Sequence, residues 1–381
     1  MADILVIDDD PVILQLLQRL LREQGYTVAT AASAEIGMAL AADLSPPVII
    51  CDWRLLPGEI DGIEVCQRIK QDPQLAATFF LLLTGHTAIA NRVQALEAGA
   101  DDLLIKPVDI AELKARVKSG LRLHELAHDL QRQKQRLEAE LKEAADYVRS
   151  LLPRDMRDRV RINARFFPSR QLGGDCFDYY WLDPDYLMIY LLDVSGHGLG
   201  AALLSTSVLN VLRSQSLPDV NFYRPEKVLA GLNEMFQMDG QNDKYFTIWY
   251  GVYNQATRQL VYASAGHPPA VLLTDRGKPQ PQIERLRTSG MPIGMMPEST
   301  YAWERCQIPP DSRLYLFSDG VYEVQQENQE LLGLEGFIQL LRLAQADTYP
   351  SLDWLLQQIE VLRIRNTVFS DDLSLLEVNF G

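Results

Sequence analysis

Residues 187–203 read LMIYLLDVSGHGLGAAL, and the character of the chain changes sharply at the middle of this stretch. An apolar run that is typical of a buried strand ends at one carboxylate, Asp193. Gly196 and Gly198 follow, and then small residues with a helical period. A glycine turn needs no acid at this point, so we expect the Asp193 carboxylate to face a cation.

Acids also occur at the edges of other predicted strands in residues 153–381. Asp175 follows a glycine pair in QLGGDCFDYY, Asp319 ends an apolar run in LYLFSDGVYE, and Asp371 and Asp372 open a strand in SDDLSLLEV. An isolated acid at a strand end is often only a turn former. The recurrence of the pattern in one region favours a shared site.

The residue types narrow the chemistry of such a site. Zinc prefers Cys and His ligands, and Ser195 does not lie in the G-x-S-x-G turn of a serine hydrolase. A set of carboxylates indicates Mg²⁺ or Mn²⁺, and two such ions about 3.5–4 Å apart are typical of phosphate ester hydrolysis. We expect His197 to be structural and His267 to fix its loop, with proton donation to a leaving group as the alternative for His267.

The first 120 residues alternate between strand and helix signals. Such alternation predicts an α/β domain with an open parallel sheet and helices on both faces. The expected strands are Ile4–Ile7, Thr27–Thr30, Val48–Cys51, Phe79–Leu83 and Leu103–Ile105, and the expected helices are Val12–Gln24, Ala34–Ala42, Ile63–Lys70, Ala88–Ala98 and one from Ile110 onward.

Polar side chains follow the strands of this predicted sheet. Asp8 and Asp9 end the first strand, Asp52 the third, Thr84 the fourth and Lys106 the fifth. Ligands of open parallel sheets bind at the carboxyl ends of the strands, so these groups converge. A hard cation such as Mg²⁺ relieves the repulsion between the acids, and the Lys and hydroxyl suit a phosphoryl group.

Residues 121–152 contain no Pro or Gly and show a heptad pattern. The seam consists of Leu123, Ala127, Leu130, Lys134, Leu137, Leu141, Ala144, Val148 and Leu151. It predicts a helical linker that forms a two-stranded parallel coiled coil and therefore a homodimer. A lone helix packed on a domain is the alternative, and Pro153 ends the helix in either case.

Strand signals cluster without intervening helices in residues 153–381, which predicts an α+β domain with largely antiparallel strands. The expected strands are Asn163–Phe167, Leu187–Leu192, Thr247–Tyr253, Leu260–Ser264, Ala270–Leu273, Leu314–Phe317 and Leu373–Val378, and the expected helices are 199–213, 225–237, 335–345 and 352–364.

The bulk properties exclude several classes of protein. A chain of 381 residues suggests two or three domains, here 1–120, 121–152 and 153–381. A net charge of −15 argues against a nucleic-acid-binding surface. Four scattered cysteines suggest neither disulfides nor a zinc site. With no apolar run of about 20 residues and no basic signal region, we expect a cytoplasmic protein that does not enter a membrane.

The motifs of the first region resemble the receiver domain of two-component response regulators, which has a flavodoxin-like fold. The resemblance rests on ILVIDDDP, VIICDWRLLPGEIDG, LLLTGH and LLIKPV. It implies that Asp52 accepts a phosphoryl group from a sensor histidine kinase. It also implies a Mg²⁺ ion held by Asp8, Asp9, Asp52 and the carbonyl of Arg54, with Thr84 and Lys106 on the phosphate. Leu103 departs from the family, which has an aromatic switch residue there.

The motifs of residues 151–381 resemble metal-dependent protein serine/threonine phosphatases of the 2C type, in the SpoIIE/RsbU branch. The resemblance rests on LLPRDM, GGDCFDYY, DVSGHGLGAAL, SAGHPPA, PIGM, LFSDGVYE and DDLSLL, in the order of the family. It implies an α-β-β-α sandwich that binds two Mg²⁺ or Mn²⁺ ions. Asp193 would bridge the ions with help from the Val194 carbonyl, and Asp175, Asp319 and Asp371 would complete the ligand set. Water activated by the metals, rather than a side chain, would attack.

Together the two resemblances imply a response regulator whose output is the hydrolysis of phosphoserine or phosphothreonine on a protein, controlled by phosphorylation of Asp52. The implied substrate is a phosphorylated anti-sigma-factor antagonist. A non-catalytic scaffold that binds an anti-sigma partner under receiver control is the alternative. A DNA-binding regulator is disfavoured by the net charge and by the lack of a helix-turn-helix pattern.

Overall fold

The chain forms two compact units, Met1–Glu138 and Ala139–Gly381, called here the N-terminal and C-terminal units. The computed structural model describes residues 2–56, 60–85, 89–169, 172–238, 243–274, 282–326, 330–343, 352–363 and 371–381. In these ranges no helix combines the length and the apolar character needed to cross a lipid bilayer.

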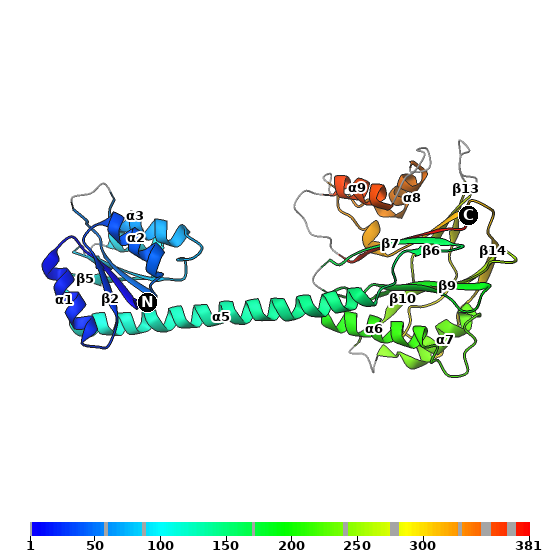
Figure 1. Ribbon diagram of the computed structural model, residues 1–381, viewed down its shortest axis with the longest axis horizontal. Helices are drawn as coiled ribbons and strands as arrows, with labels where there is room; N and C mark the ends of the chain where they lie inside the picture. The colour runs from blue at the N-terminus through cyan, green and yellow to red at the C-terminus, as the bar shows by residue number, and fades with distance from the viewer. Residues whose placement is uncertain are drawn as a thin grey trace. The chain divides into compact units, whose positions relative to one another are not determined.

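The N-terminal unit contains a parallel sheet in the order β2-β1-β3-β4-β5. Its strands are Ile4–Ile7 (β1), Val28–Ala31 (β2), Val48–Asp52 (β3), Phe79–Thr84 (β4) and Asp102–Ile105 (β5), and its helices are Pro11–Arg22 (α1), Ala34–Leu44 (α2), Gly62–Gln71 (α3), Ile89–Glu97 (α4) and the start of Ile110–Leu151 (α5). Side chains of α1 and α5 pack on one face of the sheet, and those of α2, α3 and α4 on the other. The predicted doubly covered parallel sheet is confirmed (Figure 1).

Helix α5 runs without interruption through 42 residues, and the division between the two units falls within it. The Asp109 carboxylate accepts a hydrogen bond from the Glu112 amide and caps the helix start. Leu113 and Val117 are buried against the sheet, whereas Leu130 and Leu137 are 68% and 58% exposed. The heptad seam is therefore exposed to solvent along the middle of the helix.

The C-terminal unit consists of two antiparallel sheets, in the orders β14-β11-β10-β9-β8 and β13-β12-β15-β16-β7-β6. We call them the first and the second sheet. The strands are Met156–Arg157 (β6), Arg161–Phe167 (β7), Cys176–Trp181 (β8), Tyr186–Val194 (β9), Phe246–Asn254 (β10), Gln259–Ala265 (β11), Ala270–Thr274 (β12), Gln282–Leu286 (β13), Glu304–Gln307 (β14), Arg313–Phe317 (β15) and Leu373–Asn379 (β16).

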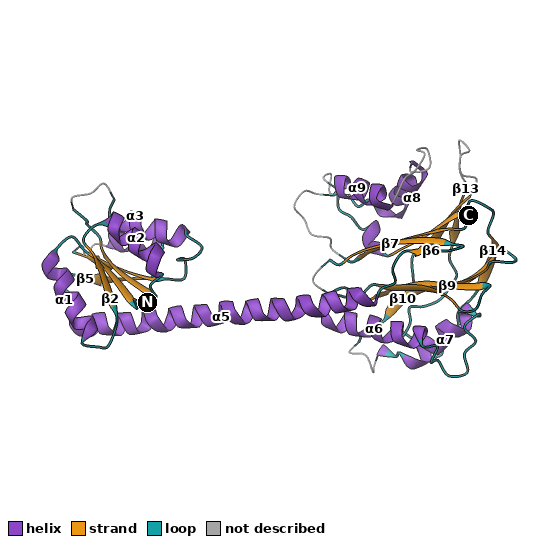
Figure 2. Ribbon diagram, in the orientation of Figure 1, coloured by secondary structure: helices purple, strands orange, loops and turns teal. Residues whose placement is uncertain are grey.

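Three apolar layers hold this unit together. One lies between the two sheets and includes Ile189, Trp249 and Leu316. The other two lie under the helix pairs that cover the outer faces (Figures 1 and 2). Leu199–Arg213 (α6) and Pro225–Met235 (α7) cover the first sheet, and Gly333–Leu343 (α8) and Leu352–Leu362 (α9) cover the second. The α-β-β-α sandwich is confirmed.

Sequence patterns missed strands that lack an apolar run. Strands β13 and β14, with the sequences QIERL and ERCQ, lie at sheet edges and are mostly exposed, so only backbone pairing defines them. Strand β8 contains Asp178 in its middle, which hides its alternation. The helix ends expected at 345 and 364 lie outside the described residues.

A buried ion pair generates a stability prediction for the C-terminal unit. Glu377 is 5% exposed and accepts hydrogen bonds from Arg313, Tyr315 and Asn163. Glu377→Ala should lower the free energy of unfolding by about 3–5 kcal/mol, because Arg313 stays buried without this carboxylate. Urea unfolding measures the change. Glu335→Ala removes the exposed Arg285 pair and is the control, with an expected effect below about 1 kcal/mol. Equal effects of the two variants would contradict the prediction.

Candidate functional site

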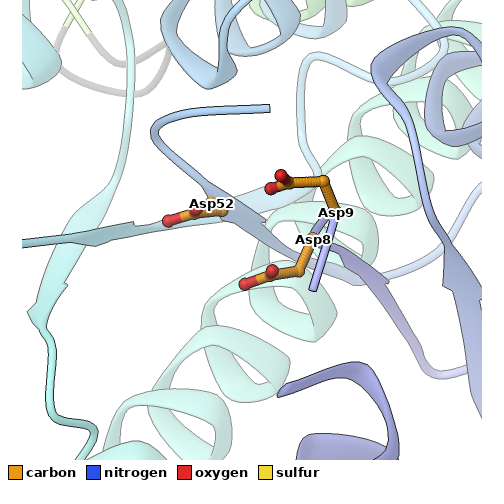
Figure 3. Close-up of side chains that lie close together, drawn as sticks. All are labelled: Asp8, Asp9 and Asp52. Atoms are coloured by element: carbon orange, nitrogen blue, oxygen red, sulfur yellow. The ribbon is translucent and has the colours of Figure 1, made fainter. Parts of the chain in front are cut away.

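The ends of parallel strands bring three carboxylates together in the N-terminal unit. Asp8 follows β1, Asp52 ends β3, and these strands are neighbours. Asp8, Asp9 and Asp52 each offer an oxygen within 4.8 Å of the other two (Figure 3). Asp8 is fully buried and Asp52 is 8% exposed. This compact oxygen set fits a hard divalent cation such as Mg²⁺.

Lys106 is the cation of this cluster. Its Nζ lies 3.0 Å from Asp8 Oδ2 and 2.9 Å from Asp52 Oδ1. Burial raises the pKa of Asp52, Lys106 lowers it in part, and the nearby Asp8 adds to the rise. Burial lowers the pKa of Lys106, but its hydrogen bonds to the two acids outweigh this and raise the pKa overall. The amine therefore stays charged and pre-positioned beside the Asp52 oxygen.

The other expected groups lie around the same strand ends. Thr84 ends β4 and is 1% exposed. Asp52, Arg54, Gly85 and Lys106 line a cavity of about 210 Å³ together with Trp53. The structure thus brings the acids, the amine and the hydroxyl to one edge of the sheet, as the sequence predicts. Leu103, at the switch position, is only 8% exposed and belongs to the core.

The acids of the C-terminal unit come from both sheets of the sandwich. Asp193 is the second-to-last residue of β9 and Asp175 directly precedes β8, both in the first sheet. Asp319 follows β15 and Asp371 precedes β16, both in the second sheet. Along β9, Leu187, Ile189 and Leu191 face the layer between the sheets, and Asp193 continues this alternation.

Mutual repulsion shows that these four acids are neighbours. The pKa of Asp193 is raised well above its usual value by burial and then by the charges of Asp319 and Asp371. Burial and the Asp193 charge likewise raise the pKa of Asp175. The pKa of Asp319 is raised to about 6, first by burial and then by Asp371. Among the described residues no three of these acids match the 4.8 Å spacing of the N-terminal trio.

The donor set fits divalent cations. Both carboxylate oxygens of Asp175 and Oδ1 of Asp319 are buried without a hydrogen-bond partner of normal geometry. Buried acceptors are costly unless a donor or a cation satisfies them. Carboxylate oxygens from two sheets, partly unsatisfied and repelling each other, are the ligands that Mg²⁺ and Mn²⁺ prefer.

Asp372 positions the loop that carries Asp175. It is 2% exposed, and it accepts hydrogen bonds from the Ser169 amide and hydroxyl and from the amides of Gly174 and Asp175. A Cβ at Gly174 would lie 2.9 Å from the Val194 carbonyl oxygen, so the glycine allows this close approach. Asp372 is therefore an internal anchor of this loop.

Asp178 and the histidines take different positions. Asp178 is buried and pairs with Arg213 at 2.7 Å. His197 is exposed, and burial raises the pKa of Asp371, which the nearby His197 opposes only in part. His267 is buried, with Nδ1 2.8 Å from the Thr247 hydroxyl. The aromatic side chains Phe177 and Tyr179 belong to the core, as expected.

Sequence reasoning named no cation for this site. In the structure, the Lys244 ammonium donates to the carbonyl of Ser195, two residues after Asp193, at 3.3 Å. Lys244 precedes β10, whose residue Thr247 pairs with Asp193. No motif surrounds Lys244, and the strand pairing alone could have pointed to it.

Comparisons with known proteins agree with this architecture. The family model of stage II sporulation protein E (SpoIIE) matches residues 183–381, and that of the response regulator receiver domain matches residues 4–118. The SiaA-PP2C domain of Pseudomonas aeruginosa has a similar fold, with a TM-score of 0.56 at 18% identity over 65% of this chain and 99% of that one.

Two of the curated relatives are phosphatases by name. The phosphoserine phosphatase RsbU of Bacillus subtilis is 26% identical over 64% of this chain and 70% of its own length. The phosphoserine phosphatase RsbP of the same organism is 31% identical over 44% of this chain, and protein IcfG of Synechocystis is 27% identical over 63%. The chain spans 41% of the length of RsbP and of IcfG.

The SpoIIE match covers more than half of the chain, and the N-terminal motifs, the sheet order and the acid cluster agree with the receiver match. The chain therefore belongs to the SpoIIE family of 2C-type phosphatase domains, and it carries a response regulator receiver domain ahead of that domain.

Proposed function

We propose that this chain is a response regulator whose output is the Mg²⁺- or Mn²⁺-dependent hydrolysis of phosphoserine or phosphothreonine on a protein. The observation that carries the proposal is the set of mutually repelling acids from two sheets, with buried oxygens that complete no hydrogen bond of normal geometry among the described residues. Asp175, Asp193, Asp319, Asp371 and the Val194 carbonyl would hold two ions. Divalent ions at such a site activate water and offset the charge that develops on the phosphoryl oxygens.

The protein's own residues orient the acids and exclude a competing nucleophile. Buried side chains of β9 fix Asp193, and Asp372 anchors the loop that carries Asp175. Cys176 is buried and its pKa is raised, so it stays a thiol. The Ser195 hydroxyl accepts a hydrogen bond from the Tyr245 amide and is part of the strand pairing. Among the described residues around these acids, no side chain resembles an activated nucleophile, which supports attack by water.

The relatives suggest the substrate and partners. RsbU and RsbP are named phosphoserine phosphatases, and we propose by analogy that the substrate is a phosphorylated anti-sigma-factor antagonist. The analogy covers the phosphatase region rather than the whole of these proteins. A sensor histidine kinase would phosphorylate Asp52, with Mg²⁺ on Asp8, Asp9, Asp52 and the Arg54 carbonyl, and with Thr84 and Lys106 on the phosphoryl group.

We also propose that residues 121–152 join a receiver domain (1–120) to a phosphatase domain (153–381) as a dimeric coiled coil. The exposed Leu130 and Leu137 support pairing with a second copy, because exposed leucines at heptad spacing gain free energy when they are buried. At the helix end, the Leu151 carbonyl accepts a hydrogen bond from Arg213 at 3.1 Å. Arg213 also holds Asp178 of β8, three residues after Asp175. This chain of contacts would carry a change in the linker towards the acids.

Loss of one central acid should abolish turnover. Asp193→Asn removes a ligand that both ions would share, so hydrolysis of p-nitrophenyl phosphate with Mn²⁺ should fall by about 100-fold or more. Asp158→Asn changes an exposed acid of the same unit and should leave the rate unchanged. Retained hydrolysis in Asp193→Asn would contradict the site. Binding of the anti-sigma partner without any turnover by the wild type would favour the scaffold alternative.

Protons should compete with the metal near pH 6. Asp319 has a folded-state pKa of about 6, above the unfolded value of about 3.9. Because the folded state binds more protons between these values, stability without metal should fall as pH rises from about 4 to 6. Ionised Asp319 binds cations better, so the Mn²⁺-induced rise in Tm should be larger at pH 7.5 than at pH 5. Asp319→Asn should reduce this difference, and an unchanged difference would contradict the assignment.

Phosphorylation of the receiver should change the hydrolysis rate. Beryllofluoride mimics the aspartyl phosphate and should alter the rate of the wild type but not of Asp52→Asn. Arg213→Met should weaken the response, because it removes the link from Leu151 to Asp178. Sedimentation of the same samples reports the oligomeric state, with Leu130→Asp as the variant that disrupts the seam. Equal rates of the wild type with and without beryllofluoride would refute the coupling.

A further inference from the structure

His267 is a buried titratable residue that the proposed reaction does not use. It is 2% exposed and lies in the segment between β11 and β12. Strand β11 belongs to the first sheet and β12 to the second. This segment is therefore a crossing between the two sheets, and both sheets contribute acids to the metal site.

One side of the His267 ring is tied to the first sheet. Its Nδ1 lies 2.8 Å from Oγ1 of Thr247 in β10. Thr247 is the direct antiparallel partner of Asp193 in β9. Residues opposite each other in antiparallel strands project their side chains to the same face. The hydroxyl that His267 engages thus stands next to the carboxylate that would be shared by the two ions.

The other side of the ring faces the second sheet. The backbone of Phe317, the last residue of β15, is close enough to raise the pKa of the imidazole. Phe317 lies two residues before Asp319. Nε2 of His267 is buried, and it completes no hydrogen bond of normal geometry among the described residues. The ring therefore lies between β10, the neighbour of the strand that carries Asp193, and β15, the strand that leads to Asp319.

The ring is neutral at working pH. Burial lowers the pKa of His267 to about 3, and the Phe317 backbone opposes this only in part. A neutral imidazole has one donor nitrogen and one acceptor nitrogen. It can join two polar groups without adding charge to an acid cluster, whereas a lysine or arginine there would compete with the cations for the carboxylates.

We propose that His267 is a positioning residue for the metal site, which ties Thr247 of the first sheet to the Phe317 end of β15 and so sets the separation of Asp193 from Asp319. The proposal rests on the metal-dependent function proposed above. The acids of the two sheets must lie at a fixed separation to share ions. A contact between the sheets next to these acids would hold them at that separation before the metal binds. It differs from donation of a proton to the leaving group, which would require His267 to reach the substrate.

The test compares metal affinity with turnover in the full chain. His267→Phe keeps a planar ring but removes both nitrogens, His267→Asn retains a polar group near the Nδ1 position, and Thr247→Val removes only the partner hydroxyl. Trp249→Phe is the matched control. Trp249 lies on the same strand and its Nε1 donates to the Leu286 carbonyl of the second sheet at 3.0 Å, away from the acids.

Calorimetry gives the Mn²⁺ affinity of the phosphatase site as the difference from Asp193→Asn, so receiver binding cancels. His267→Phe should weaken this affinity by about 10- to 100-fold, with kcat at saturating Mn²⁺ within about threefold of the wild type. His267→Asn should recover part of the affinity, and Thr247→Val should show a smaller loss. Trp249→Phe should lower the Tm in EDTA without changing the affinity.

Three results would overturn the proposal. If His267→Phe bound Mn²⁺ with the same affinity as Trp249→Phe, His267 would contribute only to the stability of the fold. A collapse of kcat at saturating Mn²⁺ with unchanged affinity would make His267 a proton donor. Equal Mn²⁺ binding by the wild type and Asp193→Asn would remove the metal site itself, and this outcome is the failure of the proposed function. If His267→Phe does not fold, Thr247→Val decides by the same criteria.

Discussion

Carboxylates buried beside one another repel, and both sites of this chain are built around that repulsion. In the sandwich, Asp175 and Asp193 from the first sheet meet Asp319 and Asp371 from the second, and burial first and then the charge of a neighbouring acid raise the pKa of each. The apolar layer between the sheets holds the strands that bring them together. Folding energy from that layer maintains an arrangement that the acids alone would not adopt.

The two units balance their acids differently. In the receiver, Lys106 reaches both Asp8 and Asp52, so one amine offsets a compact trio that comes from neighbouring strands of a single sheet. In the phosphatase domain the acids come from two sheets and lie further apart. Buried carboxylate oxygens of Asp175 and Asp319 complete no hydrogen bond of normal geometry among the described residues. In the receiver the Lys106 ammonium offsets part of the acid charge, and the compact oxygen set still fits one divalent cation. The acids of the phosphatase domain suit divalent cations that accept several oxygen ligands at once.

Buried polar residues around these acids hold the backbone segments that carry them. The Asp372 carboxylate accepts hydrogen bonds from the amides of the loop that carries Asp175. The neutral ring of His267 lies between Thr247 and Phe317. Arg213 extends this support to the end of α5 through the Leu151 carbonyl. The same polar framework that fixes the acids therefore touches the helix that comes from the receiver.

Much of the chain was readable from sequence because local pattern and function coincide there. Apolar runs that end in acids predicted the strands β1, β3, β9 and β15, since a buried strand must be apolar. They also placed Asp52, Asp193 and Asp319 at or just after strand ends, where a ligand could be held. Tertiary structure alone decided three kinds of feature: edge strands such as β14, the contacts of Asp372 and Asp178, and the positions of His267 and Lys244. The hydrogen-bonded pair Lys244–Ser195 is separated by 49 residues in the sequence, and the pair Ser169–Asp372 by 203. No local pattern encodes which distant segments will pair.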